Sequence, residues 1–186
     1  MARVLVPLAQ GCEELEAVTI TDLLTRAGID VVTAGLDEQP IKASRGMVLV
    51  PDTTLDAVLD QEFDMVVLPG GLPGADHLNA DPRIHQIIKK LSEQNKFIAA
   101  ICAAPRVLAS AGLLDNKQAT SYPGSLDGFE TNNMTYQETT VVVDGKVITS
   151  RGPGTAMDFA LVLIEQLLGK VKRDEVEAPL QRPVVK

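Results

Sequence analysis

The stretch FIAAICAAPRVLASAGLL, residues 97–114, decides the fold and places a thiol at a structural joint. Residues 97–102 are apolar and have the composition of a buried parallel strand, and the residues after Cys102 have that of a helix. A sharp turn between a strand and a helix exposes one side chain above the carboxyl edge of a sheet. We therefore weigh two interpretations of Cys102: the nucleophile of such an elbow, or a buried cysteine that packs as a small hydrophobic residue.

Outward from this stretch, the chain alternates strand and helix patterns. Short apolar runs predict further buried strands at 3–9, 30–36 and 63–71. Apolar residues that recur every three to four positions predict helices at 13–28, 81–95 and 155–169, the last opening with capping-box spacing in TAMD. This alternation predicts a doubly wound α/β fold, a three-layer sandwich around a mostly parallel sheet.

Two stretches break the alternation. Residues 41–52 and 139–150 alternate in polarity or turn at Asp-Gly, which predicts hairpin strands added to the main sheet. The final residues, 177–186, predict an extended surface segment. No repeat or linker divides the chain, so we expect a single domain over residues 1–186.

Composition limits the class of function. Hydrophobic residues make up 45% of the 186 residues, which is enough for a core of normal size. A net charge of −8 opposes binding to nucleic-acid phosphates. The N-terminal stretch has neither the charge pattern of a signal peptide nor the length of a membrane span. We therefore expect a cytoplasmic protein with no nucleic-acid or membrane partner.

The cysteines and the glycine patterns argue against a metal or a cofactor. Cys12 and Cys102 are the only cysteines, and neither belongs to a CxxC motif or a metal-ligand cluster. The chain also lacks the GxxxxGK[ST] and GxGxxG patterns of phosphate-binding loops. We expect no disulfide, no metal and no cofactor, and we interpret Cys12 as a packing thiol.

Glycines and carboxylates supply further candidates. Gly70 and Gly71 end the strand pattern 63–71, so the amides of Gly71 and Ala103 are candidates for an oxyanion hole, although a tight turn is the commoner meaning of such a pair. Acidic residues at the start of the first helix complement its dipole, but one held near Cys102 would be protonated and would move protons: Glu13, Glu14 and Glu16. We also expect a helix N-terminus to lower the pKa of Cys102.

Histidine is scarce and lies on the wrong side of Cys102 for a familiar triad. Both histidines, His77 and His85, precede Cys102, whereas amidotransferases and peptidases usually take their base from downstream. The sequence therefore disfavours that class. His77 remains a candidate to reach a pocket, and His85 is expected at the surface or at its boundary.

Six motifs in order, across nearly the whole chain, resemble the DJ-1/ThiJ/PfpI superfamily: GCEELEAV, DLLTRAGIDV, SRGMVL, DMVVLPGGLPGA, AAICAAP and TSRGPGTAMDFAL. They are most similar to its DJ-1 and YajL branch. The resemblance implies a flavodoxin-like sandwich that forms a homodimer. It also implies activity without a cofactor.

The resemblance assigns roles to individual positions. It implies that Cys102 is a reactive, oxidisable cysteine, that Glu16 is its protonated partner, and that Gly71 and Ala103 supply the oxyanion-hole amides. Arg45 matches an arginine near the dimer contact. Substrate-binding positions are also implied, of which the last two reach the neighbouring subunit's pocket: Gly70, Tyr122, Arg26 and Pro179.

Two functions follow as expectations. The first is a glyoxalase or deglycase, a hydrolase or lyase that uses a nucleophilic cysteine on methylglyoxal and its adducts, in defence against carbonyl and oxidative stress. The alternative is a non-enzymatic redox sensor or stress chaperone that works through oxidation of Cys102 to the sulfinate. Tyr122 stands where DJ-1 has a histidine, and a phenol is no base near neutral pH, which puts chemistry that relies on that histidine in question.

Overall fold

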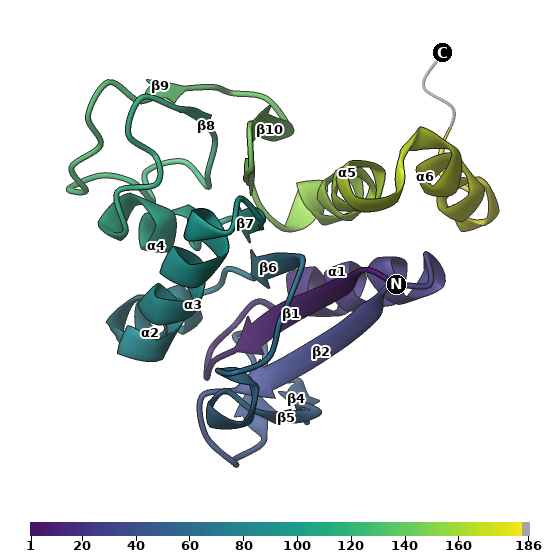
Figure 1. Ribbon diagram of the computed structural model, residues 1–186, viewed down its shortest axis with the longest axis horizontal. Coiled ribbons are helices and arrows are strands. Elements are labelled where there is room, and N and C mark those ends of the chain that lie inside the picture. The colour runs from purple at the N-terminus through teal and green to yellow at the C-terminus, as the bar shows by residue number, and fades with distance from the viewer. Residues whose placement is uncertain (184–186) are drawn as a thin grey trace.

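A seven-stranded sheet lies at the centre of the computed structural model, which describes residues 1–183 (Figure 1). The strands run in the order β10-β11-β7-β6-β1-β2-β5, and every pairing is parallel except that of β10 with β11. Their bounds are Arg3–Leu8 for β1, Asp30–Gly35 for β2, Thr53–Thr54 for β5, Met65–Leu68 for β6, Phe97–Ile101 for β7, Val141–Asp144 for β10 and Val147–Ser150 for β11.

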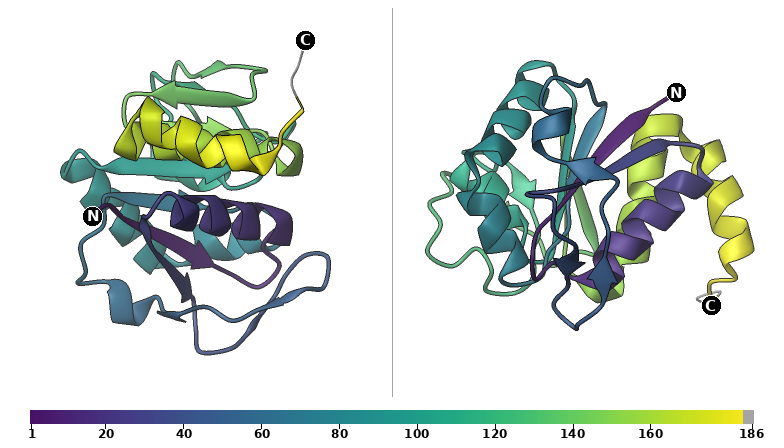
Figure 2. Two further views of the ribbon diagram at one scale, coloured as in Figure 1. Left: turned by 90° about the vertical axis from the view of Figure 1, so that its right-hand side faces the viewer. Right: turned by 90° about the horizontal axis from the view of Figure 1, so that it is seen from below.

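Helices cover both faces of this sheet, which confirms the predicted three-layer sandwich (Figures 1 and 2). One face carries α1 (Glu14–Arg26), α5 (Ala156–Leu168) and α6 (Lys170–Glu177), and the other carries α2 (Gly74–Ala80), α3 (Pro82–Glu93) and α4 (Pro105–Ser110). Side chains of a strand alternate between the two layers because successive residues point to opposite faces. In β7, Ala99 and Ile101 pack toward α5, whereas Ile98 and Ala100 pack toward α3 and α4.

The predicted strands and long helices are confirmed, with ends that differ by one to three residues. Asp81 caps α3, since its side chain accepts a hydrogen bond from the backbone N–H of Arg83 at 2.9 Å. The predicted capping box at the start of α5 is wrong. The Thr155 hydroxyl is hydrogen-bonded to Ser150, the last residue of β11, and to Gly152 of the loop that follows, so it does not cap the helix.

One of the two predicted hairpins joins the main sheet and the other does not. Strands β10 and β11 pair antiparallel, and β11 continues the sheet beside β7. Residues 41–52 instead form a separate two-stranded sheet from β3 (Ile41–Lys42) and β4 (Val48–Leu49). Another small sheet pairs β8 (Gln118–Ala119) with β9 (Thr135–Tyr136).

The C-terminal prediction is wrong in part. Helix α6 follows α5 directly, and residues Ala178–Leu180 form a short 3-10 turn where an extended segment was expected. Residues 184–186 of that expected segment lie outside the described residues. The spacing of apolar residues did not predict α6, because Val176 is its one buried residue.

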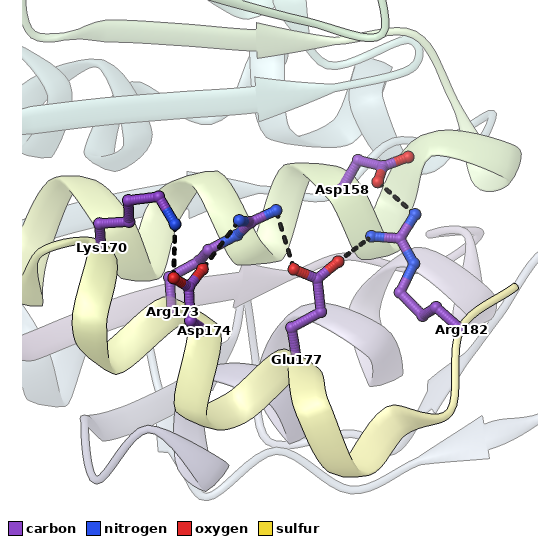
Figure 3. Close-up of polar contacts among 6 residues, drawn as sticks. All are labelled: Asp158, Lys170, Arg173, Asp174, Glu177 and Arg182. Atoms are coloured by element: carbon purple, nitrogen blue, oxygen red, sulfur yellow. Dashed lines mark hydrogen bonds and ion pairs between the residues drawn. The ribbon is translucent and has the colours of Figure 1, made fainter. Parts of the chain in front are cut away.

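Ion pairs attach α6 to its surroundings (Figure 3). Arg173 contacts Asp174 and Glu177, and Arg182 joins Glu177 to Asp158 of α5. Lys170 extends the chain of charges to Asp174. Such partly exposed pairs contribute about 0–1 kcal/mol each, so packing against α5 must supply most of the attachment.

The helices of the described region, residues 1–183, are all too short or too polar to cross a lipid bilayer.

Candidate active site

Cys102 occupies the strained turn that the sequence predicted. It follows the last residue of β7 and has φ of +64°, a conformation that non-glycine residues adopt rarely and at a cost. Its backbone N–H donates to the carbonyl of Ser150 at 3.0 Å, and its own carbonyl accepts from the N–H of Tyr122 at 2.8 Å. The packing interpretation is therefore insufficient, because neighbouring segments hold the cysteine in an elbow.

The glycine pair after β6 makes room for this elbow. A Cβ on Gly70 would lie 2.5 Å from the Cβ of Cys102 and 2.9 Å from Oε2 of Glu16. Gly71 has φ of +88°, and a Cβ there would lie 2.3 Å from the backbone nitrogen of Glu13. Neither position has space for a side chain, so the pair does more than form a turn.

Glu16 lies on the first turns of α1 and is fully buried beside this joint. Its Oε2 accepts a hydrogen bond from the N–H of Gly70 at 2.8 Å, and its Oε1 is buried without a hydrogen-bond partner among the described residues. Burial raises the pKa of Glu16 to about 7, an increase that hydrogen bonds from Gly70 and Cys102 oppose. The expected protonated carboxyl is thus supported near and below neutral pH.

The electrostatics of Cys102 differ from the prediction. Burial and the nearby charge of Glu16 raise the pKa of the Cys102 thiol to about 12, although the amides of Gly71 and Ala103 act to lower it. The expected lowering by a helix N-terminus is wrong, because α4 begins only at Pro105 and the sulfur is largely withdrawn from solvent. While Glu16 is ionised, the proton of the pair resides on sulfur, and Glu16 is positioned to receive it.

The other two acidic residues at the start of α1, Glu13 and Glu14, form hydrogen bonds with the loop at 44–47. Glu14 accepts hydrogen bonds from the N–H groups of Arg45 and Met47, and these bonds lower its pKa although burial opposes them. Glu13 accepts from the hydroxyl of Ser44 at 2.9 Å. Glu14 therefore fixes the loop at 44–47, whereas Glu16 alone of the three is placed against Cys102.

A cavity of about 400 Å³ opens over Cys102, a size that admits a small molecule. Residues from six segments line it, among them Gly71, Ala103, Tyr122, Arg45 and Arg106. Tyr122 is 54% exposed. The structure thus brings the predicted nucleophile, its amides and Tyr122 to one space.

Other predicted site residues lie elsewhere. Gly70 sits behind Cys102 and Glu16 and is not part of the cavity lining. Arg26, paired with Asp22, and Pro179 are exposed and do not line the cavity over Cys102.

Neither histidine reaches the cavity over Cys102. The Nδ1 atom of His77 is 2.9 Å from the carbonyl oxygen of Gln10, and the Nε2 atom of His85 is 2.8 Å from that of Asn79. The sequence interpretation missed Arg106 and Ser125, which line the cavity. Arg106 carried a signal, because it follows Cys102 by four residues at the start of the predicted helix, whereas Ser125 lies on a loop that only the fold brings near.

Within residues 1–183, no three side chains of His, Cys, Asp or Glu gather in a way that would hold a metal ion.

Comparison with known proteins adds to this geometry. A model of the DJ-1/PfpI family matches residues 2–166. Protein dj-1beta of Drosophila melanogaster is 47% identical over 174 residues, which cover 92% of each chain. The crystal structure of Drosophila melanogaster DJ-1beta matches with a TM-score of 0.91 at 42% identity, over 98% of this chain and 99% of that one.

Two other relatives differ in length and in name. Protein DJ-1 homolog A of Arabidopsis thaliana is 43% identical over 95% of this chain, which spans only 46% of that relative's length. A Caenorhabditis elegans relative named Glutathione-independent glyoxalase DJR-1.2 is 36% identical over 96% of this chain and 95% of its own.

The raised pKa of Glu16 predicts a pH dependence of stability. The folded-state pKa of about 7 exceeds the ordinary value of 4.5, so the neutral carboxyl favours folding at low pH and this contribution is lost as pH rises through 7. Between pH 5 and pH 8 the wild type should lose about 2–3 kcal/mol relative to Glu16→Gln, whose amide does not titrate. Urea unfolding of both proteins at several pH values measures this difference. Parallel pH curves would contradict the assignment.

Proposed function

The chain belongs to the DJ-1/PfpI family, and from that premise we propose that it is a cofactor-independent enzyme that acts on small reactive carbonyl compounds. We place it in the cytoplasm, in defence against carbonyl and oxidative stress. The observation that carries the proposal is the strained Cys102 held against the buried carboxyl of Glu16 at the floor of an open cavity. The relative named as a glutathione-independent glyoxalase supports the same class of reaction.

The first step adds the Cys102 thiol to the aldehyde carbon of methylglyoxal. A bond forms between sulfur and carbon while the carbonyl electron pair moves to oxygen, and Glu16 takes the thiol proton. The amides of Gly71 and Ala103, which face the sulfur, are placed to stabilise the negative oxygen. Glu16 then returns the proton to that oxygen, which gives a neutral hemithioacetal and restores the carboxylate.

The second step moves a hydrogen between the two adjacent carbons. The carboxylate of Glu16 takes the proton from the carbon bound to sulfur, which leaves an enediolate. Glu16 returns this proton to the neighbouring carbon while the hydroxyl proton of the first carbon passes to the oxygen of the second, and a thioester results. Water hydrolyses the thioester to lactate and frees the thiol. Tyr122 can donate a hydrogen bond at this site, but Glu16 is the group suited to carry the proton.

A deglycase reaction would reach the same hemithioacetal from a hemiaminal, the adduct of an aldehyde with an amine. Sulfur replaces nitrogen on the adduct carbon while the thiol proton passes through Glu16 to the departing amine, and the later steps are those described for methylglyoxal. The two reactions therefore share Cys102 and Glu16 and differ in the substrate that enters the cavity.

Substitution of the two central residues tests the catalytic proposal. Lactate formation from methylglyoxal should be undetectable in Cys102→Ser and should fall by about 10²–10⁴-fold in Glu16→Gln, since a general base contributes about that much. In the wild type, kcat/KM should rise with pH through about 7 as Glu16 ionises. Cys12→Ser is the matched control, because Cys12 is fully buried outside the cavity lining. The assay needs an amine-free buffer, and wild-type activity in either site variant would refute the mechanism.

We also propose that the chain forms a homodimer through α1 and the loop that Glu14 ties to it. This surface exposes apolar side chains whose contact with water is unfavourable and which a second chain would cover: Leu15, Val18, Met47, Val48 and Val50. Arg26 and Pro179 would then meet the cavity of the second chain.

Sedimentation tests the dimer. The wild type should sediment at twice the mass of the chain, and Val48→Glu should shift it toward the monomer because a charge would be buried in the interface. Val143→Glu, at an exposed position on the edge strand β10, is the matched control and should leave the mass unchanged. A wild-type monomer at micromolar concentration would contradict the dimer.

A second function is favoured by a different observation. Cys102 lines the cavity and is 9% exposed, whereas Cys12 is fully buried, so peroxide reaches Cys102 first. One peroxide converts the thiol to a sulfenic acid and a second converts that to a sulfinic acid, each releasing water. A neutral Glu16 would donate a hydrogen bond to the oxidised group, which suits a redox sensor or stress chaperone.

Peroxide titration followed by intact-mass and peptide analysis checks this second function. Cys102 should gain two oxygen atoms before Cys12 gains any, and the sulfinate should accumulate more slowly in Glu16→Ala, which has no hydrogen-bond donor. First oxidation at Cys12 would exclude it.

A further inference from the structure

Arg106 is a cavity residue that the proposed chemistry leaves unused. It lies on the first turn of α4, four residues after Cys102, and it lines the same cavity. Its side chain is only 15% exposed, which is unusual for arginine. A cation held this close to the reacting sulfur would affect which molecules enter.

The hydrogen bonds of its guanidinium are incomplete. Nη1 donates to Asp76 at 2.6 Å, and the group lies 5.7 Å from the centre of the Phe129 ring. Nε is buried without a hydrogen-bond partner among residues 1–183. A buried N–H without an acceptor costs about 1–3 kcal/mol, so the protein itself satisfies this guanidinium only in part.

The contacts of the guanidinium show which of its nitrogens is left for a ligand. Nη1 is engaged by Asp76 and Nε is enclosed by protein, so Nη2, which has no hydrogen-bond partner within residues 1–183, is the donor that remains. A charged N–H donor forms a stronger hydrogen bond with a carboxylate oxygen than with a neutral acceptor. A neutral aldehyde lacks the opposite charge.

The charges near Arg106 do not cancel its preference for a carboxylate. Asp76 neutralises part of the charge of Arg106, but its side chain is 54% exposed and is screened by water. Glu13 is an acidic residue of the lining, but Arg45 joins Arg106 there, so two cations face one acid in the cavity.

We propose that Arg106 is a specificity residue that binds a carboxylate on the substrate, so that the enzyme prefers carboxylate-bearing carbonyl compounds, such as aldehyde adducts of free amino acids, over neutral ones. The inference rests on the proposed function for the identity of the reaction. The binding site itself is testable without turnover.

Alkylation of Cys102 by two reagents of similar size measures the site directly. Iodoacetate carries a carboxylate and iodoacetamide does not, and each forms a bond from sulfur to carbon as iodide leaves and the thiol proton passes to Glu16 or water. The rate with iodoacetate divided by the rate with iodoacetamide is measured from peptides that contain Cys102. This ratio should fall about tenfold in Arg106→Gln and should be largely kept in Arg106→Lys. One charge-assisted hydrogen bond is worth at least this factor.

Controls separate this inference from the proposed function. Lys89→Met removes an equal charge from an exposed site on α3 and should leave the ratio unchanged. Iodoacetamide rates close to wild type in all variants show that the cavity is intact, and circular dichroism confirms folding. An unchanged ratio in Arg106→Gln overturns the carboxylate site even if methylglyoxal is converted. A reduced ratio upholds it even if no turnover occurs.

Discussion

The close approach of Gly70, Glu16 and Cys102 is the constraint on which the site depends. Cys102 adopts φ of +64° because β7 must turn abruptly into α4, and Gly70 packs against it where any side chain would collide. The N–H of Gly70 then holds the Glu16 carboxyl in a place without water. The strained backbone and the buried carboxyl both cost free energy of folding, and the apolar packing on the two faces of the sheet offsets this cost.

This arrangement determines how the pair handles its protons. Burial disfavours charge on either group, so the carboxyl titrates near neutrality and the thiol keeps its proton until a reaction removes it. Such a thiol is protected from indiscriminate attack and is activated when Glu16 accepts its proton. Carbonyl chemistry and controlled oxidation both draw on this property, which is why a single site supports both proposals.

The fold was largely predictable where burial alone shapes the sequence. Strands such as Arg3–Leu8 and Phe97–Ile101 lie in the middle of the sheet, and their continuous apolar runs reflect cover on both faces. Prediction failed where local pattern and tertiary contact disagree. Residues 41–52 look like a hairpin for the main sheet but pair only with each other, and α6 depends on charges and on α5 more than on an apolar stripe of its own.

By itself, the sequence determined the α/β architecture and reduced Cys102 to two interpretations, an elbow nucleophile or a packing thiol, because these depend on residue size, apolar spacing and backbone freedom. The residue pattern alone left Glu13, Glu14 and Glu16 open and the family resemblance pointed to Glu16, but only the tertiary structure supplies the physical reason, because the three carboxyls differ in their hydrogen-bond partners and in what packs over them. It also reversed the expected direction of the Cys102 pKa and brought Arg106 into the cavity. Charge states and ligand preferences follow from burial and from contacts distant in sequence, and only folding establishes these.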